Sequence, residues 1–180
     1  MCKENLFKLI RNEDVVIWAG SGMSFYAGYP TADKLAKIFF EDLSLSEQNQ
    51  INPNLTLPEL TEEIYRIKGN NKNFLLKKLK ELFIDYVPRS TEYHNKLATI
   101  SHIKTIITTN YDKLFENGYN QNCQIVYSAN QIPYLDKDKV HIFKVHGDMS
   151  DPNSIILTKT DYNNFFRFES QNDIYWTIIK

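Results

Sequence analysis

The chain has 180 residues, and at about 150 residues per domain this length predicts a single domain over residues 1–180. Its composition, 42% hydrophobic and 24% charged, can bury a substantial core, which excludes the disordered and fibrous classes. The 21 basic and 22 acidic residues leave a formal charge of -1. No global positive field therefore draws the chain to nucleic acid or to an anionic membrane, and we expect no direct contact with either.

The N-terminal residues lack the continuous apolar stretch of a signal peptide, and no later segment approaches the roughly 20 apolar residues that span a bilayer. The only cysteines, Cys2 and Cys123, cannot supply a four-thiolate metal site. Two separated thiols without a secretion signal are typical of reduced residues. We therefore expect a cytoplasmic protein.

The first part of the chain predicts a strand, a glycine-rich turn and a helix. A short helix over 5–11 leads to the β-branched run Val15–Trp18, which is typical of a strand buried on both faces. Glycines follow at Gly20–Gly22 and Gly28, and apolar residues at helical spacing then predict a helix over 31–43.

Residues 44–100 predict a helical insert, because their apolar residues recur at spacings of three and four. Residues 48–57 are rich in Asn, Pro and Thr and predict a loop within it. The second long helix of the insert is basic, and a solvated face is a better interpretation than a contact surface. Its lysines are Lys72, Lys77, Lys78 and Lys80.

Strands and helices alternate again after the insert. The β-branched run at 105–108 predicts a strand, and a helix is expected over 111–117, closing on Gly118. Further strands are expected at 124–127, 140–145 and 155–157. This order predicts an α/β, Rossmann-like fold with a largely parallel sheet and helices on both faces.

Three polar clusters follow the predicted strands: Gly20–Ser24, Thr108–Asp112 and His146–Asp148. Ligands of parallel α/β sheets bind beyond the carboxyl ends of the strands, so we expect these clusters to share one site. The glycines of the first cluster allow close backbone approach to a phosphate, although a tight turn without a ligand would also explain them.

The second and third clusters supply groups for chemistry. Asn110 can orient a ribose hydroxyl or a water molecule, with Asp112 accepting from another hydroxyl, while capping of the following helix is the structural alternative for both. His146 has a side chain that accepts a proton near neutral pH and is the predicted base, with a purely structural histidine as the alternative.

Taken together, these residues resemble the sirtuin, or silent-information-regulator-like, family, and most closely its bacterial branch in anti-phage defence proteins. Gly20–Ser24 with Gly28–Pro30 resembles the family's NAD loop, with Ser21 in place of alanine. Thr108–Asp112 resembles its threonine-x-asparagine-x-aspartate motif, and Lys144–Asp148 resembles the motif with the catalytic histidine. Residues 156–162 also resemble the segment that follows in the bacterial branch.

The resemblance implies NAD as the substrate and assigns roles to particular residues. It places Asn110 and His146 in catalysis, with His146 as the base. The cofactor-binding residues that it implies are Gly20, Ser21, Gly22, Ser24, Thr108 and Asp112. No metal is required by this chemistry, and the zinc module of the protein-deacylating sirtuins is missing, which disfavours deacylation.

We therefore expect an NAD hydrolase that releases nicotinamide and ADP-ribose, as the NAD-depleting effector of a bacterial anti-phage, or abortive infection, system. A non-catalytic NAD or ADP-ribose sensor is the main alternative. We expect the protein to form a homo-oligomer or to act with a partner protein of the defence system. A segment that closes the adenosine pocket in the family does not occur before Lys180, so a fragment of a longer protein, with low activity on its own, is also expected.

Overall fold

The centre of the protein is a four-stranded parallel sheet. The computed structural model describes residues 3–165 and 167. Its strands are β1 (Val16–Ala19), β2 (Thr105–Thr108), β3 (Cys123–Val126) and β4 (Val140–Lys144), in the order β1-β2-β4-β3. All three pairings are parallel, with Ile17, Ile106 and Ile142 in one row across the sheet. The predicted α/β, Rossmann-like fold is confirmed.

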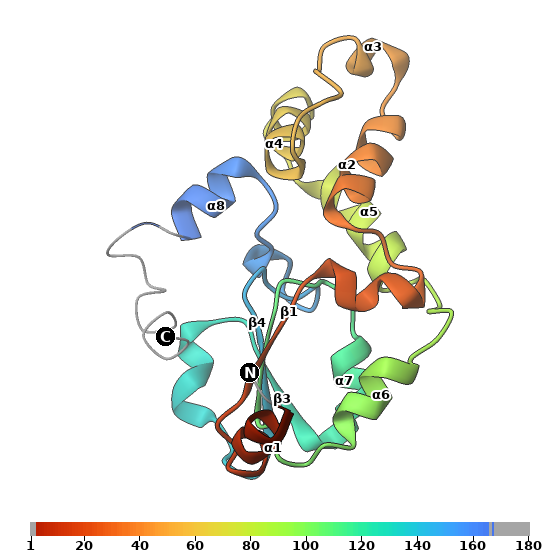
Figure 1. Cartoon of the computed structure of the whole chain (residues 1–180). Helices are drawn as coiled ribbons and strands as arrows, with labels where there is room; N and C mark the ends of the chain where they lie inside the picture. The colour runs from red at the N-terminus through yellow and green to blue at the C-terminus, as the bar shows by residue number, and fades with distance from the viewer. Residues whose placement is uncertain (1–2, 166, 168–180) are drawn as a thin grey trace.

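The helices form a lobe beyond the sheet and a layer beside it. Figure 1 shows α2 to α5 gathered beyond one end of the sheet, while α6 and α7 lie next to one another beside it. Residues 44–100, which we expected to form one helical insert, are thus divided: α3 to α5 belong to the lobe, and α6 belongs to the layer beside the sheet. The helices are α1 (Lys3–Arg11), α2 (Ala32–Glu41), α3 (Leu45–Gln48), α4 (Leu57–Ile67), α5 (Asn73–Phe83), α6 (Glu92–Ala98), α7 (Leu114–Tyr119) and α8 (Lys159–Phe165).

The two faces of the sheet carry different apolar clusters, because successive strand residues point to opposite sides. One face packs against α6 and α7, with Ile106 and Phe115 in its core. The other face, with Ile107 and Phe143, packs against the 3-10 segment η3 (Ala129–Tyr134) and Phe165 of α8. Apolar contacts on both faces fix the sheet relative to the helices, and hence the position of the carboxyl ends of its strands.

The β-branched run of β1 predicted a strand that is buried on both faces. The structure does not bury β1 in this way. Val16 and Trp18 keep 55% and 60% of their surface exposed. The reason is position: β1 is one of the two edge strands of the described sheet and pairs there only with β2. An apolar run predicts burial, but it does not show which strand of a sheet stands at the edge.

Two further sequence predictions are wrong in detail. Residues 155–157 form no strand; they are buried, but only Ile156 makes a backbone bond to the strand-end region, donating its N–H to the carbonyl of His146 at 3.0 Å. The helix over 111–117 is instead α7, which contains Gly118. The left-handed position that follows it belongs to Asn120, whose φ is 51°.

Among the described residues, none of the helices has the length and apolar character needed to cross a bilayer.

Candidate functional site

The glycine-rich segment after β1, which the sequence predicted to be a turn, is a 3-10 helix, η1 (Ser21–Ala27). It buries Ser24. A Cβ at Gly22 would meet no atom within 4 Å, so this side of η1 is open. Gly28 differs: its φ is +95°, and a Cβ there would lie 2.2 Å from the hydroxyl of Tyr86, so only glycine fits.

Asn110 joins the ends of β1 and β2. Its Nδ2 donates to the carbonyl of Gly20 at 3.1 Å and to Oγ of Ser24 at 2.9 Å. Its backbone N–H donates to Oγ1 of Thr108 at 3.1 Å. Asn110 therefore does not cap a helix with its side chain, and its Oδ1 stays buried without a partner among the described residues.

Asp112 lies just before α7, which begins three residues later than the sequence predicted and has Lys113 as its N-cap residue. Oδ1 of Asp112 accepts from the backbone N–H of Leu114 at 3.0 Å. Its Oδ2 is buried and has no partner among the described residues. A buried acceptor without a donor is costly, and such a group in a cavity indicates a place for a ligand or water. With Asn110, two such oxygens occupy one region.

His146 follows β4 and lies between two tyrosines. Oη of Tyr162 is 3.5 Å from its Nδ1, and the ring centroid of Tyr111 is 6.4 Å from its own. Burial lowers the pKa of His146 to about 4, against a smaller raising effect from the backbone of Thr109. The imidazole is therefore neutral at pH 7 and keeps a lone pair that can accept a proton.

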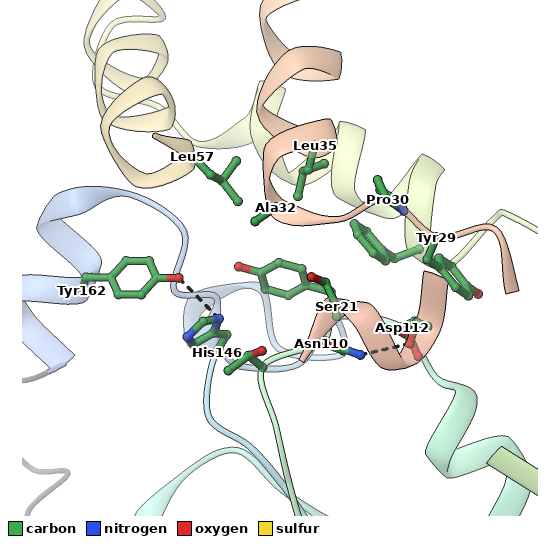
Figure 2. Close-up of a pocket in the computed structure, with 14 residues that line it drawn as sticks. Ser21, Tyr29, Pro30, Ala32, Leu35, Leu57, Asn110, Asp112, His146 and Tyr162 are labelled. Carbon is green, nitrogen blue, oxygen red and sulfur yellow. Dashed lines mark hydrogen bonds between the residues drawn. The ribbon is translucent and has the colours of Figure 1, made fainter. Parts of the chain in front are cut away.

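These groups line one cavity at the carboxyl ends of β1, β2 and β4. In Figure 2, Ala32 and Leu35 of α2 and Leu57 of α4 lie opposite His146 and Asn110, so the helical lobe forms one wall. Tyr162 points toward His146 from α8. The lining residues are Ser21, Ser24, Tyr29, Pro30, Ala32, Leu35, Leu57, Phe83, Thr109, Asn110, Tyr111, Asp112, His146 and Tyr162.

The structure thus brings together most of the residues singled out in the sequence. Ser21, Ser24, Asn110, Asp112 and His146 line the cavity. Gly20, Gly22 and Thr108 do not line it; Gly20 and Thr108 instead accept hydrogen bonds from Asn110.

Sequence reasoning missed the aromatic and aliphatic wall. Tyr29, Tyr111 and Tyr162 had a signal, since each lies in a segment that resembles the family. Leu35 and Leu57 occupy ordinary apolar positions of amphipathic helices, so nothing in their spacing marks them as lining a cavity.

Across residues 3–165 and 167, no group of three or more His, Cys, Asp and Glu side chains is arranged to hold a metal ion.

Comparison with known families identifies the class of protein to which these features are similar. The features are the parallel sheet, the glycine-rich segment and the Asn, Asp and His at the strand ends. Residues 104–180 match the family model described as a SIR2-like domain, which includes the second and third clusters. Residues 104–180 are thus similar to a SIR2-like domain, and the resemblance found in the sequence is confirmed.

Its relatives include three proteins named NAD(+) hydrolase ThsA, to which the chain is homologous. The protein of Bacillus cereus (strain MSX-D12) is 28% identical over 166 residues, covering 88% of this chain and 33% of that protein. The protein of Acinetobacter baumannii (strain 532279) is 28% identical over 168 residues, covering 90% and 33%. That of Enterococcus faecium is 26% identical over 160 residues, covering 87% and 32%. The chain spans about a third of the length of these relatives.

Proposed function

We propose that this chain is an NAD hydrolase domain that cleaves NAD to nicotinamide and ADP-ribose. One observation carries the proposal: Asn110 and Asp112, whose buried Oδ1 and Oδ2 have no partner among the described residues, line the same cavity as a neutral histidine. Ribose hydroxyls and the nicotinamide amide are donors that would satisfy such oxygens. The homology to proteins named NAD(+) hydrolase supports the same substrate.

The chemistry asks little of the protein beyond position and charge. Nicotinamide leaves from its ribose as a neutral molecule because it is already cationic in NAD, so its departure needs no proton donor. The site must hold the ribose and stabilise positive charge at the anomeric carbon. The buried oxygens of Asn110 and Asp112 supply negative potential there.

His146 acts as the base in this proposal. Its neutral imidazole takes a proton from the attacking water or from a ribose hydroxyl, and water then replaces nicotinamide at the anomeric carbon to give ADP-ribose. Asn110 orients the ribose or the water. Ser21 and Ser24, together with the open side of Gly22, would contact the ribose and phosphates.

Product separation tests this function. The 180-residue chain and a C-terminally extended version are incubated with NAD, and nicotinamide and ADP-ribose are separated and quantified. We expect equimolar products, with faster turnover by the extended version because a pocket closed on more sides holds the substrate in reach of His146 more often. NAD binding without products from either chain would favour the sensor, and turnover of an acyl peptide would favour a deacylase.

We further propose that the biological role is NAD depletion in the cytoplasm during bacterial anti-phage defence, by a homo-oligomer or with a partner protein. The resemblance of residues 156–162 to the bacterial branch supports this role. In bacteria that express the protein, cellular NAD should fall after phage infection, and it should not fall with His146→Ala. Constant NAD in infected cells with the active protein would contradict the role.

A further inference from the structure

Lys144 is a buried cation next to the candidate site. It is the last residue of β4, two residues before His146, and its side chain is 1% exposed. Its Nζ lies 2.9 Å from Oε1 of Glu116 on α7 and 2.7 Å from Oδ2 of Asp148. The predicted roles for the Lys144–Asp148 motif use only its histidine.

The same ammonium also holds the loop that carries Asn110 and Asp112. Nζ donates to the backbone carbonyl of Asp112 at 3.0 Å and lies 3.5 Å from that of Tyr111. One group therefore joins the loop after β2, the helix α7 and the loop after β4. Because Asn110 and His146 lie on two of these segments, Lys144 fixes the distance between them.

Asp148 is itself held in place. Oδ1 of Asp148 accepts the backbone N–H of Ser150 at 2.9 Å. Between His146 and Asp148, Gly147 has a φ of +86°, and a Cβ there would lie 2.1 Å from the carbonyl of Ser154. The loop after β4 thus has little freedom to adjust if the ammonium is removed.

A stability role alone explains this cluster poorly. Burying a charged triad costs desolvation that a well-packed apolar side chain would avoid, so a buried lysine is weak evidence for stability and is better explained by geometric specificity. Burial lowers the pKa of Lys144, but the charges of Glu116 and Asp148 outweigh this and raise it, so the group stays cationic.

We propose, on the basis of the proposed NAD hydrolase function, that Lys144 is a positioning residue that sets the Thr108–Asp112 loop against His146 in the geometry needed for turnover. It touches no reacting atom and acts through the backbone carbonyls and the two carboxylates.

The test removes the triad without leaving a buried charge unpaired. The triple variant Lys144→Met/Glu116→Gln/Asp148→Asn is compared with a matched triad on the surface, where Lys78 bridges Asp42 at 3.0 Å and Glu81 at 3.1 Å. The control is Lys78→Met/Asp42→Asn/Glu81→Gln. Each variant is measured for thermal unfolding, for kcat and KM with NAD, and for amide hydrogen exchange of residues 109–114.

We expect both triple variants to stay folded, kcat to fall at least tenfold only in the Lys144 variant, and amide exchange of 109–114 to rise at least tenfold while that of Ile106 and Ile107 is unchanged. Wild-type kcat and exchange in the Lys144 variant, or equal losses in both triads, would overturn the proposal.

Two additions keep the result decisive. If the Lys144 triple variant does not fold, Lys144→Arg keeps the charge but changes its geometry; the same losses support the proposal, and wild-type values overturn it. If the wild-type protein does not cleave NAD, the proposed function fails, while the exchange measurement still decides whether Lys144 orders the loop.

Discussion

Burial keeps His146 neutral and thereby sets the pH range of the proposed reaction. With a pKa of about 4 instead of 6.5, the base form persists well below neutral pH. We expect kcat for NAD cleavage to fall only as the pH drops through about 4, measured over pH 3.5–8 with the folded fraction monitored. A midpoint near 6.5 would show that His146 is solvated or is not the base.

The same shift predicts how stability depends on pH. The unfolded chain takes up the proton near pH 6.5 and the folded chain near pH 4, so the contribution of His146 is complete above pH 6.5 and is lost as the pH falls toward 4. The loss amounts to about 3 kcal/mol. Glu116, whose pKa is raised by burial, acts in the opposite direction. Urea titrations at pH 7 and pH 4 give the free energies of unfolding of wild type and of His146→Ala. The difference between the two proteins isolates the contribution of His146. A difference that is the same at both pH values would contradict the predicted loss.

Two glycines should respond differently to a side chain. Gly22 has open space around its Cβ position, so Gly22→Val should fold normally but lose NAD affinity in calorimetry, because the new side chain would block the close approach of η1 to the phosphates that the proposed function requires. Gly147→Ala should instead lower the free energy of unfolding by about 3 kcal/mol, since it meets the carbonyl of Ser154 at a positive φ. Unchanged NAD affinity in Gly22→Val would show that η1 does not contact the substrate.

At the scale of elements, α8 is joined to the helical lobe by polar contacts that place Tyr162 near His146. Glu62 of α4 accepts from the backbone N–H and from Oγ1 of Thr160, both at 2.9 Å. Lys72, next to α5, pairs with Asp161. The lobe therefore holds α8 over the site.

Glu62→Ala should loosen this attachment. We expect a loss of about 2 kcal/mol in the free energy of unfolding, because hydrogen bonds to a buried carboxylate are lost, and a severalfold lower kcat with NAD. The neighbouring Glu63→Ala is the control, since its carboxylate pairs with Arg66 at the surface. Equal effects of the two variants would show that Glu62 does not hold α8.

Local patterns predicted the four described strands to within one residue, because β-branched runs such as Thr105–Thr108 favour strands, but the apolar run at 155–157 predicted a further strand that these residues do not form. The patterns also predicted that Asn110 and His146 would lie at one edge of the sheet, because parallel strands end there, and both residues line the cavity at that edge. They could not predict that Trp18 stands at an exposed edge or that Leu57 lines the cavity. Both depend on which segments pack together, which spacing alone does not encode.

For the whole molecule, the exposed edge strand predicts an uneven distribution of stability. Trp18→Ala should cost only about 1.5 kcal/mol, although tryptophan is the largest residue type, because the side chain is 60% exposed. Ile106→Ala, in the centre of the sheet and fully buried, should cost about 3 kcal/mol. Denaturant titrations of both variants compare them, and a cost for Trp18→Ala equal to that for Ile106→Ala would mean that β1 is covered in solution.

We propose that the strand-end cavity is a site for NAD cleavage in which His146 is the base. Nicotinamide release by wild type and by His146→Ala, at equal concentrations and with circular dichroism and thermal unfolding of both, tests this claim most directly. We predict that His146→Ala keeps the fold and binds NAD but releases nicotinamide at least a hundredfold more slowly. Wild-type release by the folded variant, or loss of activity only in proportion to loss of fold, would contradict it.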